Sequence, residues 1–460
     1  MRRRNFLKDV GMFYLLSMSG VLTSACGAQN SRKIRISNTE SLVEKEPLIE
    51  PFGFKGGYLS ELWQIAVRLR GSGGNQVIGL GTQSVLWSDK SVFLAHSEDE
   101  GNALMYAITQ QALKIIKGQS FSDPVTLLED ILDEVYAFGK KLTKNPNLRK
   151  TFILNALVAV DNALWLLYAK ENGLSSFDQM IPEEYRSTFS ERHKNVAAIP
   201  LVAYGTSAEQ LRQTVTDGHF FMKIKLGQPG TQQEMLQKDM ERLGSIHEVL
   251  KDVRTPHTYN GKLPYYFDAN GRYESKETFL RFLEHAQKIG AFDQITIVEE
   301  PFPEELQIDV SDIPVRLAAD ESAHTDVDTI TRIKMGYRAI ALKPIAKTLS
   351  MTMKIAKAAT EQNIPCFCAD LTVNPILVEW NKNIAARLKT FPGLNGLGLL
   401  ESNGAQNYKN WKTMKSYLPI SNQRLGDVRD GLFSTGPDFY ESSGGIFKLP
   451  THYNDLFGKI

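Results

Sequence analysis

Phe-Met-Lys-Ile-Lys (residues 221–225), Tyr-Phe-Asp-Ala-Asn (266–270), Ile-Val-Glu-Glu-Pro (297–301), Ala-Ala-Asp-Glu-Ser (318–322) and Ile-Ala-Leu-Lys-Pro (340–344) follow one another along the chain. Each is a short apolar run that ends in charged or polar residues. A strand of a parallel sheet buried on both faces has this pattern, and functional side chains gather at its C-terminal end. The runs predict five consecutive strands that present Lys, Asp, Glu, Asp and Lys at one edge.

The pattern continues on both sides of this stretch. After about Val196, short apolar runs alternate with helical stretches, which predicts parallel strands with helical crossovers. Strand ends are expected near Tyr204, Lys225, Asp268, Glu299, Asp320, Lys343, Asp370 and Glu401. Eight is the strand number of a TIM barrel. We therefore predict a barrel with a metal site over residues 191–405, with an insertion before Asp268.

Residues 51–190 are predicted to form an α+β capping domain. Two strands joined by Gly-Ser-Gly-Gly are expected at 61–70 and 76–86, after a mobile loop at 52–58. Apolar residues three or four apart predict helices at 101–116, 124–142 and 148–171. Residues 406–460 lack this rhythm and are expected to fold back on the cap.

The N-terminus has the features of an export signal over residues 1–26, with basic residues before an apolar core. Its paired arginines resemble the twin-arginine signal, and Leu22 to Cys26 resembles a lipoprotein cleavage box in which Cys26 is lipidated. The alternative is an uncleaved anchor helix, although the apolar core is short for a bilayer. Residues 27–50 are expected to be a poorly ordered tether. We expect an exported bacterial protein, either periplasmic or a membrane-anchored lipoprotein.

The amino-acid composition limits the classes of partner that we expect. The 460 residues hold 53 Lys and Arg against 52 Asp and Glu, a formal charge of +1. We expect a small-molecule carboxylate as partner, no nucleic acid, and membrane contact only through a lipid anchor. Three cysteines are too few for a disulfide scaffold, so Cys366 and Cys368 are interpreted as buried thiols. The sequence leaves a homo-oligomer open.

Three carboxylates at the predicted strand ends indicate a metal site. Asp268, Glu299 and Asp320 follow successive strands, so their side chains should converge at the barrel mouth. Hard oxygen ligands without His or Cys suit Mg²⁺, or Mn²⁺ as the alternative ion. Carboxylates so close would repel one another without a cation.

Two lysines complete the predicted site. Lys225 and Lys343 should lie on opposite sides of the ion, and Lys223 on the same face as Lys225. A base lysine needs a lowered pKa, which Lys223 and the metal could supply. This set suits abstraction of a proton α to a carboxylate, since a divalent ion can neutralise the enediolate that results.

These motifs together resemble the enolase superfamily, in its mandelate racemase/muconate lactonizing enzyme family and the dipeptide epimerase-like branch. They are Lys-x-Lys at 223–225, Asp-Ala-Asn at 268–270, Glu-Glu-Pro at 299–301, Ala-Asp-Glu-Ser at 319–322 and Lys343. The resemblance implies an α/β fold: a modified TIM (β/α)7β-type barrel under an α+β capping domain. It also implies metal ligands Asp268, Glu299 and Asp320, and acid/base residues Lys225 and Lys343, as is general for this superfamily.

The sequence departs from relatives in ways that bear on substrate. No histidine lies between His324 and His452, which argues against a His-dependent acid-sugar dehydratase, and Glu401 stands where dipeptide epimerases carry Asp-x-Asp. Residues with an open role, as metal support, substrate contact or structural cap, are Asn270, Glu321, Asp370 and Glu401. Lys347 is expected to be solvated.

We expect a Mg-dependent isomerase, a racemase or epimerase of an amino-acid or dipeptide derivative. A syn-dehydratase (a lyase) or a cycloisomerase of the same superfamily is the alternative, because the same lysine pair serves those reactions. A non-catalytic exported binding lipoprotein is the second alternative.

Overall fold

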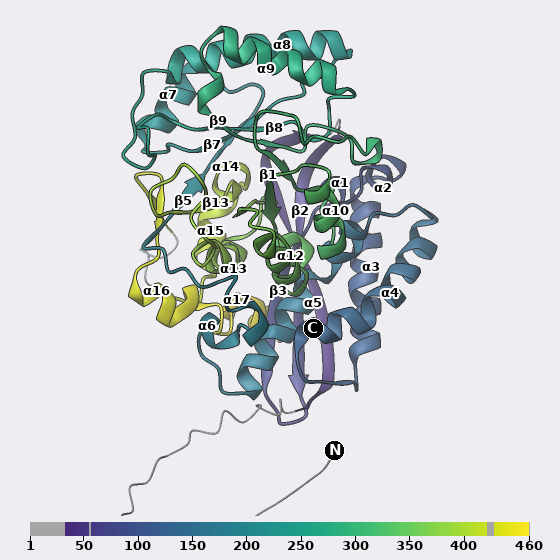
Figure 1. The fold of residues 1–460 in the computed structure, drawn as a ribbon. Coiled ribbons are helices and arrows are strands. Elements are labelled where there is room, and N and C mark those ends of the chain that lie inside the picture. Colours follow the sequence, from purple (N-terminus) through teal and green to yellow (C-terminus); the bar gives the residue numbers. More distant parts are fainter. Residues whose placement is uncertain (1–32, 55–56, 421–426, 460) are drawn as a thin grey trace, which may run out of the picture. The chain divides into compact units, whose positions relative to one another are not determined.

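The computed structural model describes residues 33–460 except 55, 56, 421–426 and 460. The predicted export signal with Cys26, and residues 27–32 of the predicted tether, lie outside them. The described chain forms a four-stranded antiparallel sheet and an eleven-stranded, mostly parallel sheet (Figure 1). The predicted α/β class, a barrel with an α+β cap, is confirmed.

The barrel strands run parallel in chain order and end where the sequence predicted. They are β5 (Asn195–Ile199), β6 (Leu201–Val202), β7 (Met222–Lys225), β8 (Tyr265–Asp268), β9 (Ile295–Glu299), β10 (Leu317–Ala319), β11 (Ala339–Leu342), β12 (Cys366–Cys368) and β13 (Gly398–Glu401). β5 and β6 are one strand interrupted at Pro200, which has no N–H for the ladder. Because β5 pairs with β13 and β6 with β7, the ring of eight strand positions closes.

Helices alternate with these strands. They are α7 (Ala208–Thr216), α8 (Gln232–Leu250), α9 (Lys276–Lys288), α10 (Asp326–Lys334), α11 (Pro344–Lys347), α12 (Leu349–Glu361) and α13 (Pro375–Ala385). Capping boxes start α7, α8 and α10. The predicted insertion is the turn between α8 and β8, where Thr258 bridges to Leu394. Since Leu394 precedes β13, the insertion lies at the end of the barrel where strands begin, away from the mouth.

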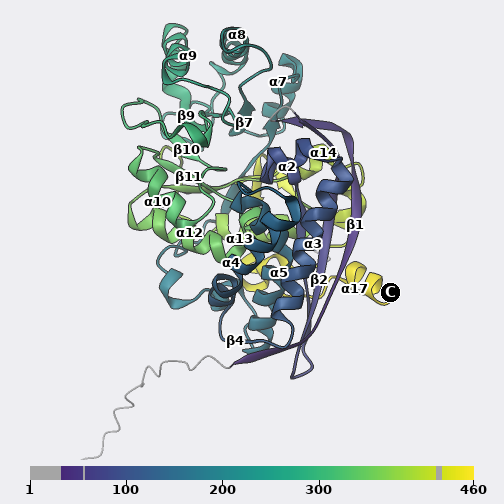
Figure 2. The ribbon, with the colours of Figure 1, turned by 90° about the vertical axis from the view of Figure 1, so that its right-hand side faces the viewer.

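The cap is built on a long antiparallel sheet of order β3-β2-β1-β4 (Figure 2). Its strands are β1 (Ile34–Phe54), β2 (Gly57–Gly71), β3 (Gln76–Gln83) and β4 (Ser120–Phe121). Its helices are α1 (Val85–Ser88), α2 (Lys90–Ala95), α3 (Glu98–Ile116), α4 (Pro124–Thr143) and α5 (Lys150–Glu171), followed by the short α6 (Phe177–Met180). The predicted hairpin and the three long helices are therefore present.

Helix α5 is the core helix of the cap. By length and composition it could cross a membrane, but 94% of its apolar window is buried inside the structure. It packs closely on β3, because a Cβ at Gly79 would lie 2.2 Å from the Ala163 amide nitrogen. Only glycine permits that approach.

The tether prediction is wrong from Ile34 onward, and so is the loop predicted at 52–58. Residues 34–54 form β1, which pairs with β2 along most of its length, and residues 52–54 pair with 57–59. Apolar side chains such as Ile36 and Leu42 are buried, while Arg35 and Lys45 are exposed. The polar composition of one face concealed a strand whose hydrogen-bond partner lies further along the chain.

The C-terminal segment contacts both parts of the chain. It contains α14 (Gly404–Asn407), α15 (Trp411–Lys415), β14 (Val428–Arg429), β15 (Leu432–Ser434), α16 (Pro437–Ser442) and α17 (Thr451–Phe457). β15 adds to the barrel sheet beside β5. In α17, His452 Nε2 lies 2.9 Å from Glu44 Oε1 of β1, so the chain end reaches the cap sheet.

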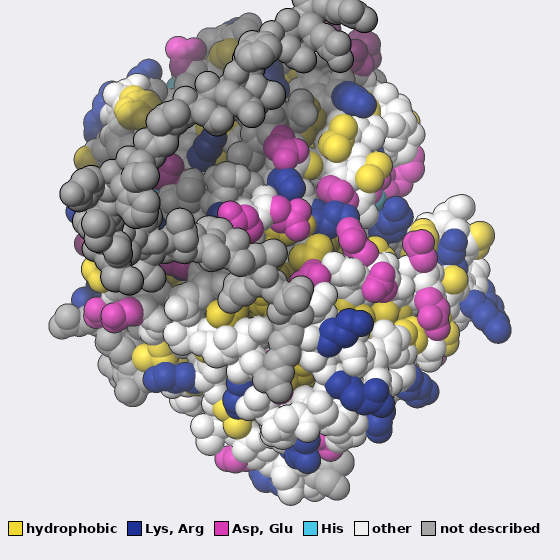
Figure 3. Space-filling view, turned by 60° about the horizontal axis from the view of Figure 1, so that its bottom comes forward, with side chains coloured by type: hydrophobic (Ala, Val, Ile, Leu, Met, Phe, Trp, Pro, Cys, Tyr) yellow, Lys and Arg dark blue, Asp and Glu magenta, His cyan; other side chains and the backbone are white. Residues whose placement is uncertain are grey.

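Charges of both signs intermix on the surface. On the face shown in Figure 3, Lys and Arg side chains are interspersed with Asp and Glu among the described atoms. Such a face produces no strong field of one sign toward a charged polymer.

A buried hydrogen-bond group joins α5 to the barrel. Asp161 Oδ2 accepts the Ser350 amide N–H at 3.0 Å, and the Ser350 hydroxyl donates to Asp161 Oδ1. The Trp165 indole N–H donates to Ser350 Oγ at 2.9 Å. Burial raises the pKa of Asp161 to about 6, although these hydrogen bonds favour the ionised form.

This pKa predicts how stability changes with pH. A folded-state pKa above the unfolded value means that Asp161 contributes stability below about pH 4, which is lost as the pH rises to about 6. The loss amounts to about 3 kcal/mol. Asn at 161 can accept from the Ser350 amide and cannot ionise. The melting temperature of Asp161→Asn minus that of wild type should therefore rise by a few degrees from pH 4 to pH 7.

Asp130→Asn is the matched control, because Asp130 is exposed on α4. Its melting temperature should follow that of wild type across the range. A difference for Asp161→Asn that falls with pH would contradict the assignment.

Candidate active site

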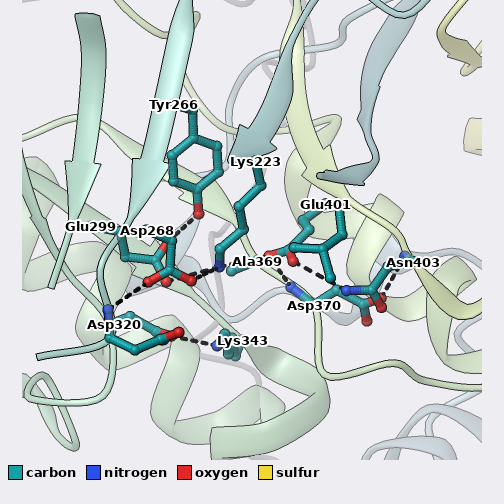
Figure 4. Close-up of polar contacts among 12 residues, drawn as sticks. Lys223, Tyr266, Asp268, Glu299, Asp320, Lys343, Ala369, Asp370, Glu401 and Asn403 are labelled. Carbon is teal, nitrogen blue, oxygen red and sulfur yellow. Dashed lines mark hydrogen bonds and ion pairs between the residues drawn. The ribbon is translucent and has the colours of Figure 1, made fainter. Parts of the chain in front are cut away.

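The predicted site residues lie together at the mouth of the barrel. Lys225, Asp268, Glu299 and Glu401 are the last residues of β7, β8, β9 and β13. Asp320 and Lys343 directly follow β10 and β11, and Asp370 comes two residues after β12. Parallel strands end at the same rim, so the barrel brings residues from 223 to 403 into one cluster (Figure 4).

Lys223 lies among three carboxylates. Its Nζ is 3.0 Å from Asp268 Oδ2, 2.9 Å from Glu299 Oε1 and 3.2 Å from Glu401 Oε2 (Figure 4). Burial alone would lower the pKa of Lys223, but the carboxylates raise it well above its usual range. Lys223 is therefore a fixed cation, and the expectation that the two neighbouring lysines lower each other's pKa is wrong for it.

Lys225 is connected to the opposite side of the site through Asn270. Lys225 Nζ donates to Asp268 Oδ2 at 2.6 Å and to Asn270 Oδ1 at 2.7 Å. The Asn270 amide donates to Glu321 Oε1 at 3.2 Å. Asn270 thus orients both a candidate base and a carboxylate, and it does so from a left-handed backbone conformation (φ +46°).

Asp320 lies between two lysines. Lys343 Nζ donates to Asp320 Oδ2, and Lys347 Nζ is 3.5 Å from Asp320 Oδ1. Lys347 also donates to the carbonyl oxygens of Asp320 and Ala323, at 2.6 and 3.0 Å. The expectation that Lys347 is solvated is wrong: its side chain is fully buried. The single turn of α11 returns residue 347 to the side of residue 343.

Lys343 and Lys347 differ in the direction in which their surroundings shift the pKa. For Lys343, the lowering of the pKa by burial is exceeded by the attraction of Asp320, and its pKa is raised. For Lys347, burial prevails and its pKa is lowered. The Lys343 ammonium also lies 4.6 Å from the ring centre of Trp87 in the cap.

The carboxylates fit a divalent cation. Glu299, Asp320 and Glu321 each offer an oxygen within 4.8 Å of the others. Asp268, the third predicted ligand, is held by Lys223 and Lys225 in this arrangement, and its pKa is lowered because these lysines outweigh burial. The compact group therefore has Glu321 where the sequence predicted Asp268.

The charge balance supports the same fit. Acidic side chains outnumber the lysines that they face: the acidic ones are Asp268, Glu299, Asp320, Glu321, Asp370 and Glu401, and the lysines are Lys223, Lys225, Lys343 and Lys347. Burial raises the pKa of Glu299 well above its usual range, and Asp268 and Asp320 add to this. Tyr266 donates a hydrogen bond to Glu299. Hard oxygen donors with excess negative charge match Mg²⁺ or Mn²⁺.

Glu300 supports the loop that carries Asp320. Its Oε2 accepts the amide N–H groups of Asp320 and Ser322, at 2.8 and 3.3 Å. Burial and the nearby Glu321 raise the pKa of Glu300 to about 7. Its backbone is left-handed, at φ +41°, which fits a residue constrained by its surroundings.

Asp370 and Glu401 form the side of the site next to β13. Glu401 Oε2 accepts the Asp370 amide N–H at 2.9 Å, and Asp370 Oδ2 accepts that of Asn403 at 2.8 Å. The Asn403 side chain donates to Glu401 Oε1 at 3.3 Å. Both Glu401 oxygens thus have protein partners. Burial and Glu401 raise the pKa of Asp370 to about 6.

Many of these side chains line a pocket between the barrel and the cap. Sequence reasoning missed Tyr266, Lys347 and Trp87. Tyr266 precedes Asp268 by two residues and so shares its face of β8, which is a usable signal. Trp87 lies in a four-residue helix of the cap, and its local sequence gives no such signal.

No family model matches this chain, and no curated protein sequence is significantly similar to it. Solved structures are similar in fold. A protein of Enterococcus faecalis V583, described as an unknown member of the enolase superfamily, is 16% identical, with a TM-score of 0.62 over 92% of this chain and 98% of that one. A dipeptide epimerase of the same organism, solved with Mg and L-Leu-L-Tyr, is 15% identical (TM-score 0.58; 82% and 92%).

L-Talarate dehydratase from Polaromonas sp. JS666, solved with Mg and L-glucarate, is 17% identical, with a TM-score of 0.58 over 87% of this chain and 92% of that one. Epimerases and a dehydratase thus share this fold with the chain. At these identities the likeness establishes the fold alone, a barrel with a cap like those of the enolase-superfamily structures, and the chemistry must be argued from the site.

Metal binding should be measurable as stabilisation. Mg²⁺ at about 100 times its Kd should raise the free energy of unfolding by about 2.7 kcal/mol. Glu299→Gln and Asp320→Asn should abolish the accompanying rise in melting temperature. Comparison of Asp268→Asn with Glu321→Gln identifies the third ligand as the one whose loss removes the shift.

Glu305→Gln is the control, because Glu305 is exposed outside the cluster. It should keep the full Mg²⁺-dependent shift. An equal Mg²⁺ response in wild type and in the Glu299 and Asp320 variants would contradict the proposed site.

Proposed function

We propose that this protein is a divalent-metal-dependent enzyme that abstracts the proton α to a carboxylate, most simply an isomerase that epimerises or racemises an amino-acid or dipeptide derivative. One observation carries the proposal. Lys225 and Lys343 flank a buried carboxylate cluster in a single cavity.

The barrel places the two lysines on opposite sides. In the ring of eight strand positions, β7 and β11 are separated by β8, β9 and β10, which is half the circumference. A substrate α-carbon between them would have one ammonium or amine on each face. When one lysine removes the proton and the ammonium of the other delivers its own proton to the opposite face of the α-carbon, the configuration inverts.

Other residues around the two lysines would support this proton transfer. A divalent cation held by the carboxylates would supply positive charge for the substrate carboxylate and its enediolate form. Lys223, with its raised pKa, stays protonated and fixes Asp268 and Glu299 in place. Trp87 over Lys343 excludes water from one face of that side chain.

Isomerisation is favoured over acid-sugar dehydration by the composition of the cavity. No histidine is present among the described residues that line it, and β12 ends in buried Cys366 and Cys368. The fold is shared with dipeptide epimerases as well as with a dehydratase. Elimination through one lysine would produce a new product rather than a stereoisomer, so the reaction products distinguish the two.

Proton exchange in D₂O tests the chemistry. In the Mg²⁺-loaded enzyme, deuterium should appear at the α-carbon of both stereoisomers of a substrate, as seen by proton NMR across dipeptides, N-acyl amino acids and hydroxy acids. Lys225→Ala and Lys343→Ala should each lower the rate of inversion by about 10²–10⁴-fold. Each variant should retain exchange on one stereoisomer only, and the two variants should retain opposite ones.

Lys334→Ala, at an exposed lysine of α10, should exchange and invert at the wild-type rate. Retention of inversion in both active-site variants would disprove the two-lysine mechanism. Bound compounds that never exchange in the wild type would favour a binding protein.

We also propose that the protein acts outside the bacterial cytoplasm, anchored by a lipid at Cys26. This rests on the sequence of residues 1–26. Wild type should fractionate with membranes, and Cys26→Ser should lose incorporation of labelled fatty acid. Equal labelling of both proteins would contradict lipidation at this residue.

A further inference from the structure

The cap contributes an apolar roof to the catalytic cavity. Of the described cap residues that line it, four are apolar, namely Leu48, Leu59, Leu62 and Trp87, and Ser84 is the one polar residue. The barrel contributes the charged floor. The cavity is therefore divided into a charged side and an apolar side.

The four apolar residues of the roof are buried, so almost none of their surface is open to bulk solvent. Relative exposures are 7% for Leu48, 3% for Leu59, 2% for Leu62 and 3% for Trp87. Two leucines of the barrel, Leu201 and Leu371, continue the apolar lining at its edge.

A buried polar network holds the roof in position over the barrel. The side chain of Gln64 in β2 donates to Tyr408 Oη and accepts from Asn374 Nδ2, each at 2.9 Å. Tyr408 donates to the Thr372 carbonyl at 2.6 Å, and its backbone bridges to Leu48. Because Leu48 and Leu62 lie beside residues fixed in this way, the roof is preformed.

We infer that the substrate carries an apolar group, branched aliphatic or aromatic, at the end away from the reacting carboxylate, and that Leu48, Leu59, Leu62 and Trp87 bind it. The inference rests on the proposed function, because the charged floor must bind the carboxylate. A charged distal group would lose its hydration against the three leucine side chains, which cannot hydrogen-bond to it. An apolar group gains affinity there, by about fourfold for each methylene buried.

Substrate competition tests the inference. We would compare dipeptides that share one C-terminal residue and differ at the N-terminal residue: leucyl, phenylalanyl, alanyl, glutamyl and lysyl. The leucyl and phenylalanyl compounds should have kcat/KM for α-proton exchange at least about tenfold above the glutamyl and lysyl compounds. Equal or higher values for the charged compounds would overturn the inference.

A pair of variants locates the effect in the roof. Leu62→Asn should raise KM about tenfold for the leucyl compound and leave kcat within about threefold, with little effect on the alanyl compound. Ile49→Asn, at an exposed side chain of β1 outside the cavity, is the control and should behave as wild type with both compounds. Equal losses on the leucyl and alanyl compounds would indicate a general defect and overturn the assignment of Leu62.

Binding without turnover separates this inference from the proposed function. Analogues with a methyl group in place of the α-hydrogen cannot exchange, and their Kd for the Mg²⁺-loaded protein can be measured calorimetrically. Preferential binding of leucyl analogues without exchange of any true substrate would support the roof and reject the catalytic proposal. Exchange of true substrates together with preferential binding of charged analogues would support the catalytic proposal and reject the roof.

Discussion

Excess buried negative charge at the barrel mouth is the constraint on which the rest of the site depends. Six carboxylates and four lysines occupy a place from which water is largely excluded. Each carboxylate is costly to ionise there unless a cation or a hydrogen bond compensates. This explains why Lys223 contacts three acidic side chains, why Tyr266 donates to Glu299, and why the protein alone leaves Glu299 with a raised pKa. A divalent cation bound by these carboxylates would complete the balance.

Much of this could be predicted from sequence because barrel geometry is regular. A short apolar run between helices is a buried parallel strand, and a polar residue at its end must lie at the common rim. Lys225, Asp268 and Glu299 lie at the ends of the adjacent strands β7, β8 and β9, as this regularity predicts. The prediction needed only strand order and the period of two along each strand.

The rest depended on contacts between distant segments. The polar composition of residues 34–50 predicts a tether, and only pairing with β2 reveals a strand there. The sequence predicts a solvated Lys347, because a one-turn helix cannot be told from the start of a longer one. The nearness of Glu321 to Glu299 depends on the path of the loop after β10, which spacing does not specify. Trp87 enters the cavity from another part of the fold.

The barrel and the cap therefore contribute different surfaces to the cavity, and the hydrogen bonds between them limit how far either can move. Among the described residues that line the cavity, the charged ones come from the barrel, and the cap supplies mostly apolar surface. Two buried polar junctions, Asp161 with Ser350 and Gln64 with Asn374, hold the cap on the barrel. Buried hydrogen bonds tolerate little displacement, because a broken one leaves a polar group without water. Substitutions in the roof can change the distal group that is bound, whereas substitutions in the junctions would move the roof relative to the lysines and affect binding and proton transfer together.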